Sequence, residues 1–218
     1  MEIIVQGKGI EYFVPDEVKL NITFKTKEDS YENALSLGIK CVNDFVNKIL
    51  LTNGFKKEDM KTRNFIIKEE KIYDEVTRKY LLDGFSFNQY ATLKFDYNKE
   101  KIAKIMEELS KLDNPPLCQI TFDVKNTKLC QSKVLSKAFE EAKIKAETIA
   151  LAAGKELKKC IKIDFKPFTS EYISESNFGS DRMYANKARQ GVTDEIVNTF
   201  TPEDIEVSET LYTLWIAE

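Results

Sequence analysis

The chain has 218 residues, of which 42% are apolar and 32% are charged, and its formal net charge is -3. This length can bury a sizeable core without disulfides or metal, and the composition is that of a soluble globular protein. The net charge argues against a general nucleic-acid binder. Histidine is absent, which excludes Ser-His-Asp and Cys-His catalysis, H-E-x-x-H zinc sites and imidazole general bases.

The sequence shows no sign of export or of a membrane span. No apolar run approaches the roughly 20 residues that a spanning helix requires. The first ten residues, MEIIVQGKGI, lack a basic segment followed by an apolar one, so no signal peptide is predicted. We therefore expect a cytoplasmic protein.

The four cysteines are far apart, and none belongs to a C-x-x-C pair: Cys41, Cys118, Cys130 and Cys160. Buried free thiols are favoured over a redox or metal-binding role. No cofactor and no metal site are therefore predicted.

Two strands are predicted near the N-terminus, at 3–9 and 16–26, joined by a glycine-containing turn. Gly7 and Gly9 in "GKG" are assigned to that turn, because the motif is too short to hold a phosphate group. In 16–26 apolar residues alternate with polar ones, which indicates one buried and one solvated face.

Pro15 and Asp16 stand at the start of the second strand. Asp16 is interpreted as a strand-start cap or turn acceptor rather than as a catalytic carboxylate. An amphipathic helix is expected from about residue 30 to 52. Two long strands follow at 61–75 and 79–96, joined by a polar, charged turn.

A short helix is predicted at 99–112, then a strand around 120–124 and a long helix at about 127–153. On that long helix Ala138, Ala142 and Ala146 share one face with larger apolar residues. Small residues on one side allow close approach to a packing partner, so this face is predicted to be buried. Gly154 is expected to end the helix.

The C-terminal part is predicted to contain strands at 157–168 and within 203–218, separated by a long flexible insertion at about 170–202. In the last strand the main apolar positions are assigned to Ile205, Val207, Leu211 and Leu214. A row of lysines in and around the first strand is interpreted as a solvated edge rather than as a phosphate or acid-binding surface; it comprises Lys155, Lys158, Lys159, Lys162 and Lys166.

These elements predict an α+β fold in one domain over 1–218. Mainly antiparallel sheet would carry two long helices and one short helix. A similar run of glycine, charged residues and strand follows both long helices. The chain therefore reads as two strand-helix-strand-strand units joined by the short helix at 99–112.

Several segments together resemble the SIMPL-domain family, named for a mammalian signalling protein that associates with a Pelle-like kinase. The matching segments, in the family's order, are GKG, VPDEVKLNI, EAKIKAETIALAAGKEL and TPEDIEVSETLYTLWI. The resemblance implies an α+β domain with helices on antiparallel sheet and no established enzymatic activity. The resemblance also implies an envelope location, as many bacterial relatives look exported, and some relatives resemble oligomer-forming proteins; the absence of a signal peptide here departs from those relatives.

Two functions are compatible with these patterns. The leading hypothesis is a non-catalytic module that associates with itself or with another protein, through strand edges and the insertion. It is motivated by seven acids and no basic residue over 190–218, against a mildly basic remainder. The alternative is a small carboxylate- or tyrosine-based hydrolase or ligand-binding protein with a cleft beside the insertion; a pocket with two or more carboxylates of raised pKa would favour it. No small-molecule substrate is identified.

Ile144 and Leu151 are the candidate interaction residues, because they lie one heptad apart on the charged side of the long helix. Two contacts fit this spacing, one with the first helix of the same chain and one with a neighbouring subunit. Replacing both with lysine should lower the oligomeric mass in solution, since lysine cannot fill an apolar seam. Light scattering after gel filtration measures the mass, and far-ultraviolet circular dichroism checks the fold. A wild-type monomer with both side chains in solvent would contradict this contact.

Overall fold

The structure is a computed structural model that describes residues 1–168 and 201–218. In chain order its elements are β1 (Glu2–Phe13), β2 (Glu17–Glu28), α1 (Tyr31–Phe45), the π-helix η1 (Val46–Leu50), the 3-10 helix η2 (Lys57–Asp59), β3 (Met60–Asp74), β4 (Lys79–Asp96), α2 (Lys99–Ser110), β5 (Leu117–Asp123), α3 (Thr127–Ala152), β6 (Leu157–Asp164) and β7 (Ile205–Ala217). They form two compact units, one of 1–14, 124–168 and 203–218, the other of 15–123.

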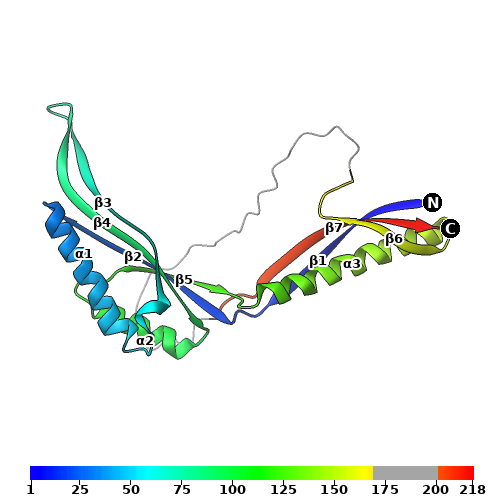
Figure 1. The fold of residues 1–218 in the computed structure, drawn as a ribbon, viewed down its shortest axis with the longest axis horizontal. Coiled ribbons are helices and arrows are strands. Elements are labelled where there is room, and N and C mark those ends of the chain that lie inside the picture. The colour runs from blue at the N-terminus through cyan, green and yellow to red at the C-terminus, as the bar shows by residue number, and fades with distance from the viewer. Residues whose placement is uncertain (169–200) are drawn as a thin grey trace. The chain divides into compact units, whose positions relative to one another are not determined.

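The unit of 15–123 is an antiparallel sheet in the order β3-β4-β2-β5, with α1 and α2 packed on one face (Figure 1). The chain order β2-α1-β3-β4-α2-β5 is that of the split βαβ arrangement. The predicted alternation in β2 is confirmed, because Leu20, Ile22 and Phe24 are buried toward the helices. Phe24 meets Phe45 of α1 edge to face at 5.5 Å between ring centroids.

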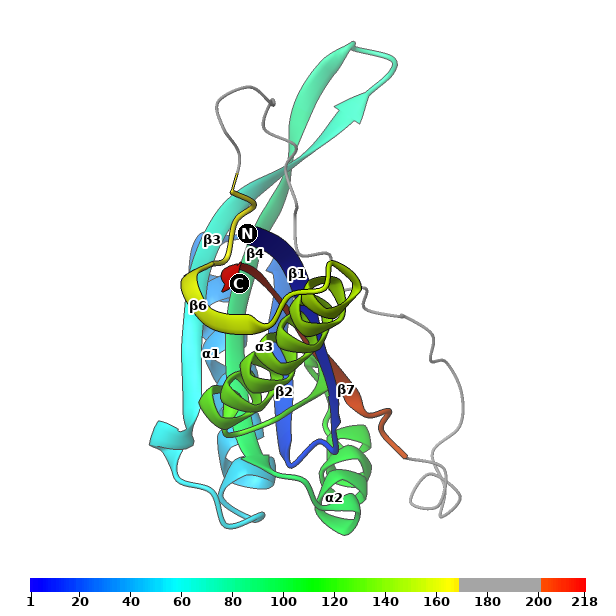
Figure 2. The ribbon, with the colours of Figure 1, turned by 90° about the vertical axis from the view of Figure 1, so that its right-hand side faces the viewer.

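The other unit is a three-stranded antiparallel sheet in the order β1-β7-β6, with α3 lying along β1 and β7 (Figure 2). It repeats the path of β2-α1-β3-β4. In each unit the chain runs through a first strand, a helix and the outer strand, and the last strand inserts between the two strands; in the second unit residues 15–123 intervene between β1 and the segment that contains α3. The predicted α+β class and the two strand-helix-strand-strand units therefore agree with the observed topology.

The strands that form the second repeat differ from those predicted. Strand β5, which precedes α3 in the chain, pairs with β2 and not with any strand beside α3. The strand that completes the second repeat is β1, more than a hundred residues earlier in the chain. Its partner β7 pairs with it along the whole of its length, from Glu2 to Phe13.

The assignment of Gly7 and Gly9 to a turn was wrong. Both lie inside β1, where they face α3 at backbone contact. A Cβ atom on Gly7 would stand 2.0 Å from the carbonyl oxygen of Ala138, and one on Gly9 would stand 2.0 Å from that of Val134. The glycines are needed because the helix backbone occupies the space that side chains would fill.

The small face of α3 is buried as predicted. The alanines at 138, 142 and 146 are each 0% exposed, and Ala150 is 1% exposed. Beside them Ile3, Val5 and Trp215 complete the apolar cluster of this unit. The helix ends where expected, since Gly154 adopts φ +69° and Lys155 N–H donates to the Ala150 carbonyl at 2.9 Å.

The buried face of β7 was only partly predicted. Leu211 is buried, but the residues that follow it on the α3 side are Thr213, Trp215 and Ala217, while Leu214 points to the opposite face. Thr213 accepts from the Trp215 indole N–H at 2.7 Å and donates to the Val5 carbonyl at 3.3 Å. These bonds satisfy the polar groups in the core, which is why a threonine is tolerated there.

The expectation of one domain over 1–218 stays a prediction. The insertion at 170–202 falls almost entirely outside the described residues.

Replacing Ala142 with leucine should destabilise this fold, because the Ala142 side chain is fully buried beside Gly7. Overpacking of this kind lowers the free energy of unfolding by about 1–3 kcal/mol. Urea unfolding followed by Trp215 fluorescence measures the change. Ala152→Leu is the matched control, since Ala152 is exposed on the same helix; equal midpoints for the two variants would contradict close packing at Ala142.

Candidate functional site

The free edge of β1 is covered by two side chains from α3. In its sheet β1 pairs only with β7, which leaves one row of backbone groups without a strand partner. On that row Lys145 Nζ donates to the Gln6 carbonyl at 2.9 Å, and the Lys8 N–H donates to the Glu141 carboxylate. Glu141 and Lys145 also form an ion pair of 3.0 Å. The edge is thereby closed to another strand at this point.

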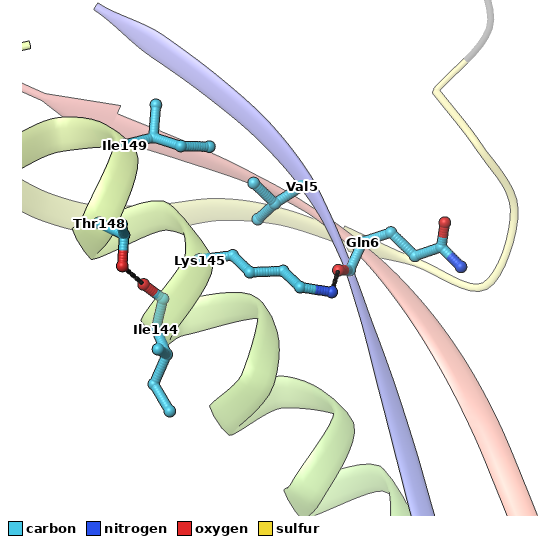
Figure 3. A pocket seen from close by; sticks show the side chains of 6 residues that line it. All are labelled: Val5, Gln6, Ile144, Lys145, Thr148 and Ile149. Atoms are coloured by element: carbon cyan, nitrogen blue, oxygen red, sulfur yellow. Dashed lines mark hydrogen bonds between the residues drawn. The ribbon is translucent and has the colours of Figure 1, made fainter. Parts of the chain in front are cut away.

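A shallow groove of about 470 Å³ lies between β1 and α3 (Figure 3). It is lined by Val5, Gln6, Ile144, Lys145, Thr148 and Ile149. Ile149 is 45% exposed here. Since the lining contains no carboxylate and Lys145 is held by Gln6, the groove offers no pair of groups for acid-base catalysis.

The two candidate interaction residues are both exposed, Ile144 at 59% and Leu151 at 79%. Only Ile144 lines the groove. Their role in a contact between chains stays a prediction.

Pro15 and Asp16, which the sequence placed at the start of a strand, lie where β2 begins. Pro15 is buried and Asp16 is exposed at the start of β2. The Asp16 N–H donates to the Asp123 carbonyl at 3.1 Å, and its own carbonyl accepts from the Tyr97 N–H at 3.0 Å. These backbone bonds tie together the ends of neighbouring strands.

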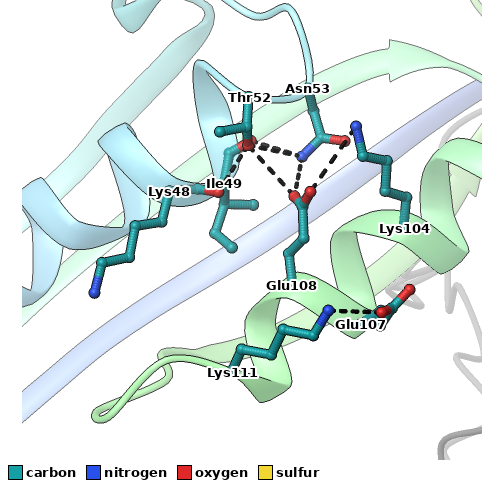
Figure 4. Close-up of polar contacts among 8 residues, drawn as sticks. All are labelled: Lys48, Ile49, Thr52, Asn53, Lys104, Glu107, Glu108 and Lys111. Atoms are coloured by element: carbon teal, nitrogen blue, oxygen red, sulfur yellow. Dashed lines mark hydrogen bonds and ion pairs between the residues drawn. The ribbon is translucent and has the colours of Figure 1, made fainter.

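A polar cluster joins the end of η1 to α2 (Figure 4). The Glu108 carboxylate accepts from the Asn53 amide and, at 3.4 Å, from the Thr52 hydroxyl, and it pairs with Lys104 at 3.9 Å. Asn53 and Thr52 also bond to carbonyls in the last turn of η1. Thr52 and Asn53 thus satisfy carbonyl groups at the end of the helix, and Glu108 is held by these two residues and by Lys104.

The carboxylates of the described residues lack the raised pKa values that would favour a hydrolase. In the described part of the chain, every carboxylate with a resolved shift has a lowered pKa: Glu70, Asp74, Glu107, Glu141 and Glu156. Hydrogen bonds to the charged form cause each of these shifts. No raised carboxyl pKa of the kind expected for a general acid is found among these residues.

The cysteine environments agree with inert thiols. All four are unbridged, and Cys41 and Cys130 are buried. Burial raises the pKa of Cys118 to about 12 and also raises the pKa values of Cys41 and Cys160. A thiol with a raised pKa is a poor nucleophile at neutral pH. Within the described residues no group of three His, Cys, Asp or Glu side chains is placed to hold a metal ion.

The hairpin of β3 and β4 extends beyond the other strands of its sheet (Figures 1 and 2). We call residues 70–83 the arm. Pairing of β4 with β2 stops at Phe85, while pairing with β3 continues to Lys79. Apolar side chains of the arm are exposed: Ile72, Tyr73, Val76, Tyr80, Leu81 and Leu82.

The arm is apolar on both faces. Directly opposed residues share a face, so Ile72 and Leu81 lie on one side and Tyr73 and Tyr80 on the other. The two tyrosine rings are 5.2 Å apart. The sequence predicted the two strands and their polar turn here, but not an exposed apolar surface. The consecutive apolar residues at 72–73 and 80–82 depart from the alternation of a one-faced strand, without showing whether the two faces are buried or exposed.

Changing Glu141 to glutamine should weaken the closure of the β1 edge in a pH-dependent way. The Lys8 N–H, and then Lys145, lower the pKa of Glu141 below its usual 4.5. Because the folded pKa is the lower one, this carboxylate stabilises the fold above about pH 4.5 and loses the effect as pH falls through the folded value. The loss in unfolding free energy at neutral pH should not exceed about 1 kcal/mol, since the pair is exposed.

Urea unfolding of Glu141→Gln and wild type at neutral pH and near pH 3 checks this expectation. The difference between the two proteins should shrink at the lower pH. Glu140→Gln is the control, because Glu140 is exposed one residue away on the same helix. A difference that does not change with pH would rule out the proposed role of the Glu141 charge.

Comparison with known proteins agrees with the resemblance noted in the sequence. No helix among the described residues has the length and apolar character needed to cross a membrane. A comparison with curated proteins found none that matches this chain. The family described as "SIMPL: Protein of unknown function (DUF541)" matches residues 3–213, nearly the whole length. The chain therefore belongs to the SIMPL family.

Proposed function

We propose that this protein is a non-catalytic interaction module, and that the arm is its main contact surface. The observation that carries the proposal is the exposure of apolar pairs on both faces of residues 70–83. A two-stranded hairpin is at best marginally stable in water by itself. An arm of this kind gains stability when another protein covers at least one of its faces.

The exposure of the apolar side chains supports this function. Val76 at the tip is 92% exposed and Tyr80 is 71% exposed. Ile72 and Leu82 are also more than half exposed, at 57% and 56%. Scattered exposed apolar residues need no explanation, but several on one short hairpin are typical of a binding site.

The chemistry of the described residues favours binding over catalysis. The groove beside α3 has no carboxylate in its lining, and the shifted carboxylates are all stabilised in their charged form. The chain also contains no histidine. No observation supports the alternative of a hydrolase, and the cleft it would use beside 170–202 falls mainly outside the described residues.

A photo-reactive phenylalanine analogue at Val76 tests the function in the native cell. Because Val76 is the most exposed apolar residue of the arm, illumination should produce covalent adducts of higher mass. The adducts should decrease when Ile72 and Leu81 are both changed to serine, since these changes remove the apolar pair on one face.

The matched control places the same analogue at Lys111, an exposed polar position on α2 in the same unit. Adduct formation at Val76 no greater than at Lys111 would contradict an interaction role for the arm.

A further inference from the structure

One edge of the arm has no strand partner in the described residues. From Lys79 to Leu82, β4 pairs with β3 on one side, and Asp83 follows at a register shift. On its other side β2 reaches only as far as the pair of Glu28 with Phe85, and the chain then turns into α1. The backbone groups on that side of Lys79–Asp83 are therefore available to a further strand.

The sequence of this open segment is self-complementary in an antiparallel sense. It reads Lys-Tyr-Leu-Leu-Asp from 79 to 83. If the segment is laid against a second copy in the opposite direction, with Leu81 at the centre, Lys79 comes opposite the partner's Asp83. Tyr80 then comes opposite the partner's Leu82. Opposite charges and aromatic-aliphatic pairs are both favourable when directly opposed across antiparallel strands.

We propose that Lys79–Asp83 pairs antiparallel with the same segment of a second copy of this chain, about a two-fold axis at Leu81. The inference rests on the proposed function and names its partner. A two-fold contact of this type is isologous, so each favourable pair occurs twice. The four strands of the two arms join into one continuous sheet, the mode of binding known as strand addition.

The joined arms extend the apolar pairs on each face. On one face Ile72 and Leu81 continue into the partner's Leu81 and the partner's Ile72, because Ile72 is opposite Leu81 within each arm. On the other face Tyr73 and Tyr80 continue into the partner's Leu82. Side chains that are isolated pairs in one chain therefore become rows across four strands, which buries more of their surface.

The register is limited by the structure at the base of the arm. Gly84 adopts φ +100° and its backbone stands against the Glu28 carbonyl, so that a Cβ atom there would approach this oxygen to 2.6 Å. The open edge consequently ends at residue 84, and a second strand has room for the five residues from 79 to 83. A short pairing of this kind corresponds to the small end of protein interfaces, so a reversible dimer is expected.

Charge reversal with cross-rescue tests the pairing. Lys79→Glu places two acids opposite each other at both ends of the segment, and Asp83→Lys places two lysines there. Each variant alone should dimerise about tenfold or more weakly than wild type, because two attractive pairs become two repulsive ones. An equimolar mixture of the two variants restores opposite charges in the heterodimer, and its dissociation constant should return to near the wild-type value.

Analytical ultracentrifugation over a dilution series measures these dissociation constants, and circular dichroism confirms that each variant is folded. Lys27→Gln is the control for Asp83, since Lys27 pairs with Asp83 within the chain; it should dimerise as well as wild type. Variants that dimerise like wild type, or a mixture that stays as weak as the single variants, would overturn the proposal. A lower mass in the Ile144→Lys, Leu151→Lys variant alone would move the interface to α3.

The outcome separates this inference from the proposed function. A wild-type protein that is monomeric at every concentration overturns self-pairing. If Val76 still forms adducts with other proteins in the cell, the interaction function stands without it. If Val76 forms no adducts and the protein is monomeric, both fail.

Discussion

The contact between the β1 backbone and the α3 backbone constrains the whole of the unit formed by 1–14, 124–168 and 203–218. Gly7 and Gly9 have no room for a Cβ atom, and the facing positions on the helix, Val134, Ala138 and Ala142, have no exposed surface. Alanine buries little apolar area, so this interface depends on many close van der Waals contacts rather than on large side chains. The same close approach brings Glu141 and Lys145 within reach of the β1 edge, which they cover.

Local periodicity was sufficient to predict the individual elements, but not which strands pair. The alternation in β2, the alanine face of α3 and the glycine after it were all read correctly, because each depends on residues within one element. Strand pairing was inferred from proximity in the chain, which is the usual arrangement. It failed for Gly7 and Gly9, because β1 pairs with β7, about two hundred residues away, and it failed for β5 for the same reason. A glycine in a strand and a glycine in a turn look alike in sequence.

The candidate surfaces show the same limit. The exposure of Ile144 and Leu151 follows from helical geometry alone. To predict the arm, one must know that β2 stops at Glu28 while β3 and β4 continue. Without the sheet, the apolar residues at 72–73 and 80–82 are indistinguishable from those of a strand buried on both faces.

Three other strand edges in the described part of the chain carry features that discourage pairing, which supports a role for the open edge of the arm. Strand β1 is covered by Glu141 and Lys145. The outer strand β6 carries two register shifts and is rich in lysine, and the outer strand β3 carries one, between Thr62 and Asn64. Bulges and lysines are the usual means by which proteins prevent unwanted strand pairing. Residues 79–82 of β4 pair with β3 without a register shift, and the shift in β4 comes only at the base of the arm, between Leu82 and Phe85. The two charges of 79–83 have opposite sign and sit at opposite ends. A charge pattern that only prevented pairing would repel a second copy, whereas this one attracts a copy in the antiparallel orientation.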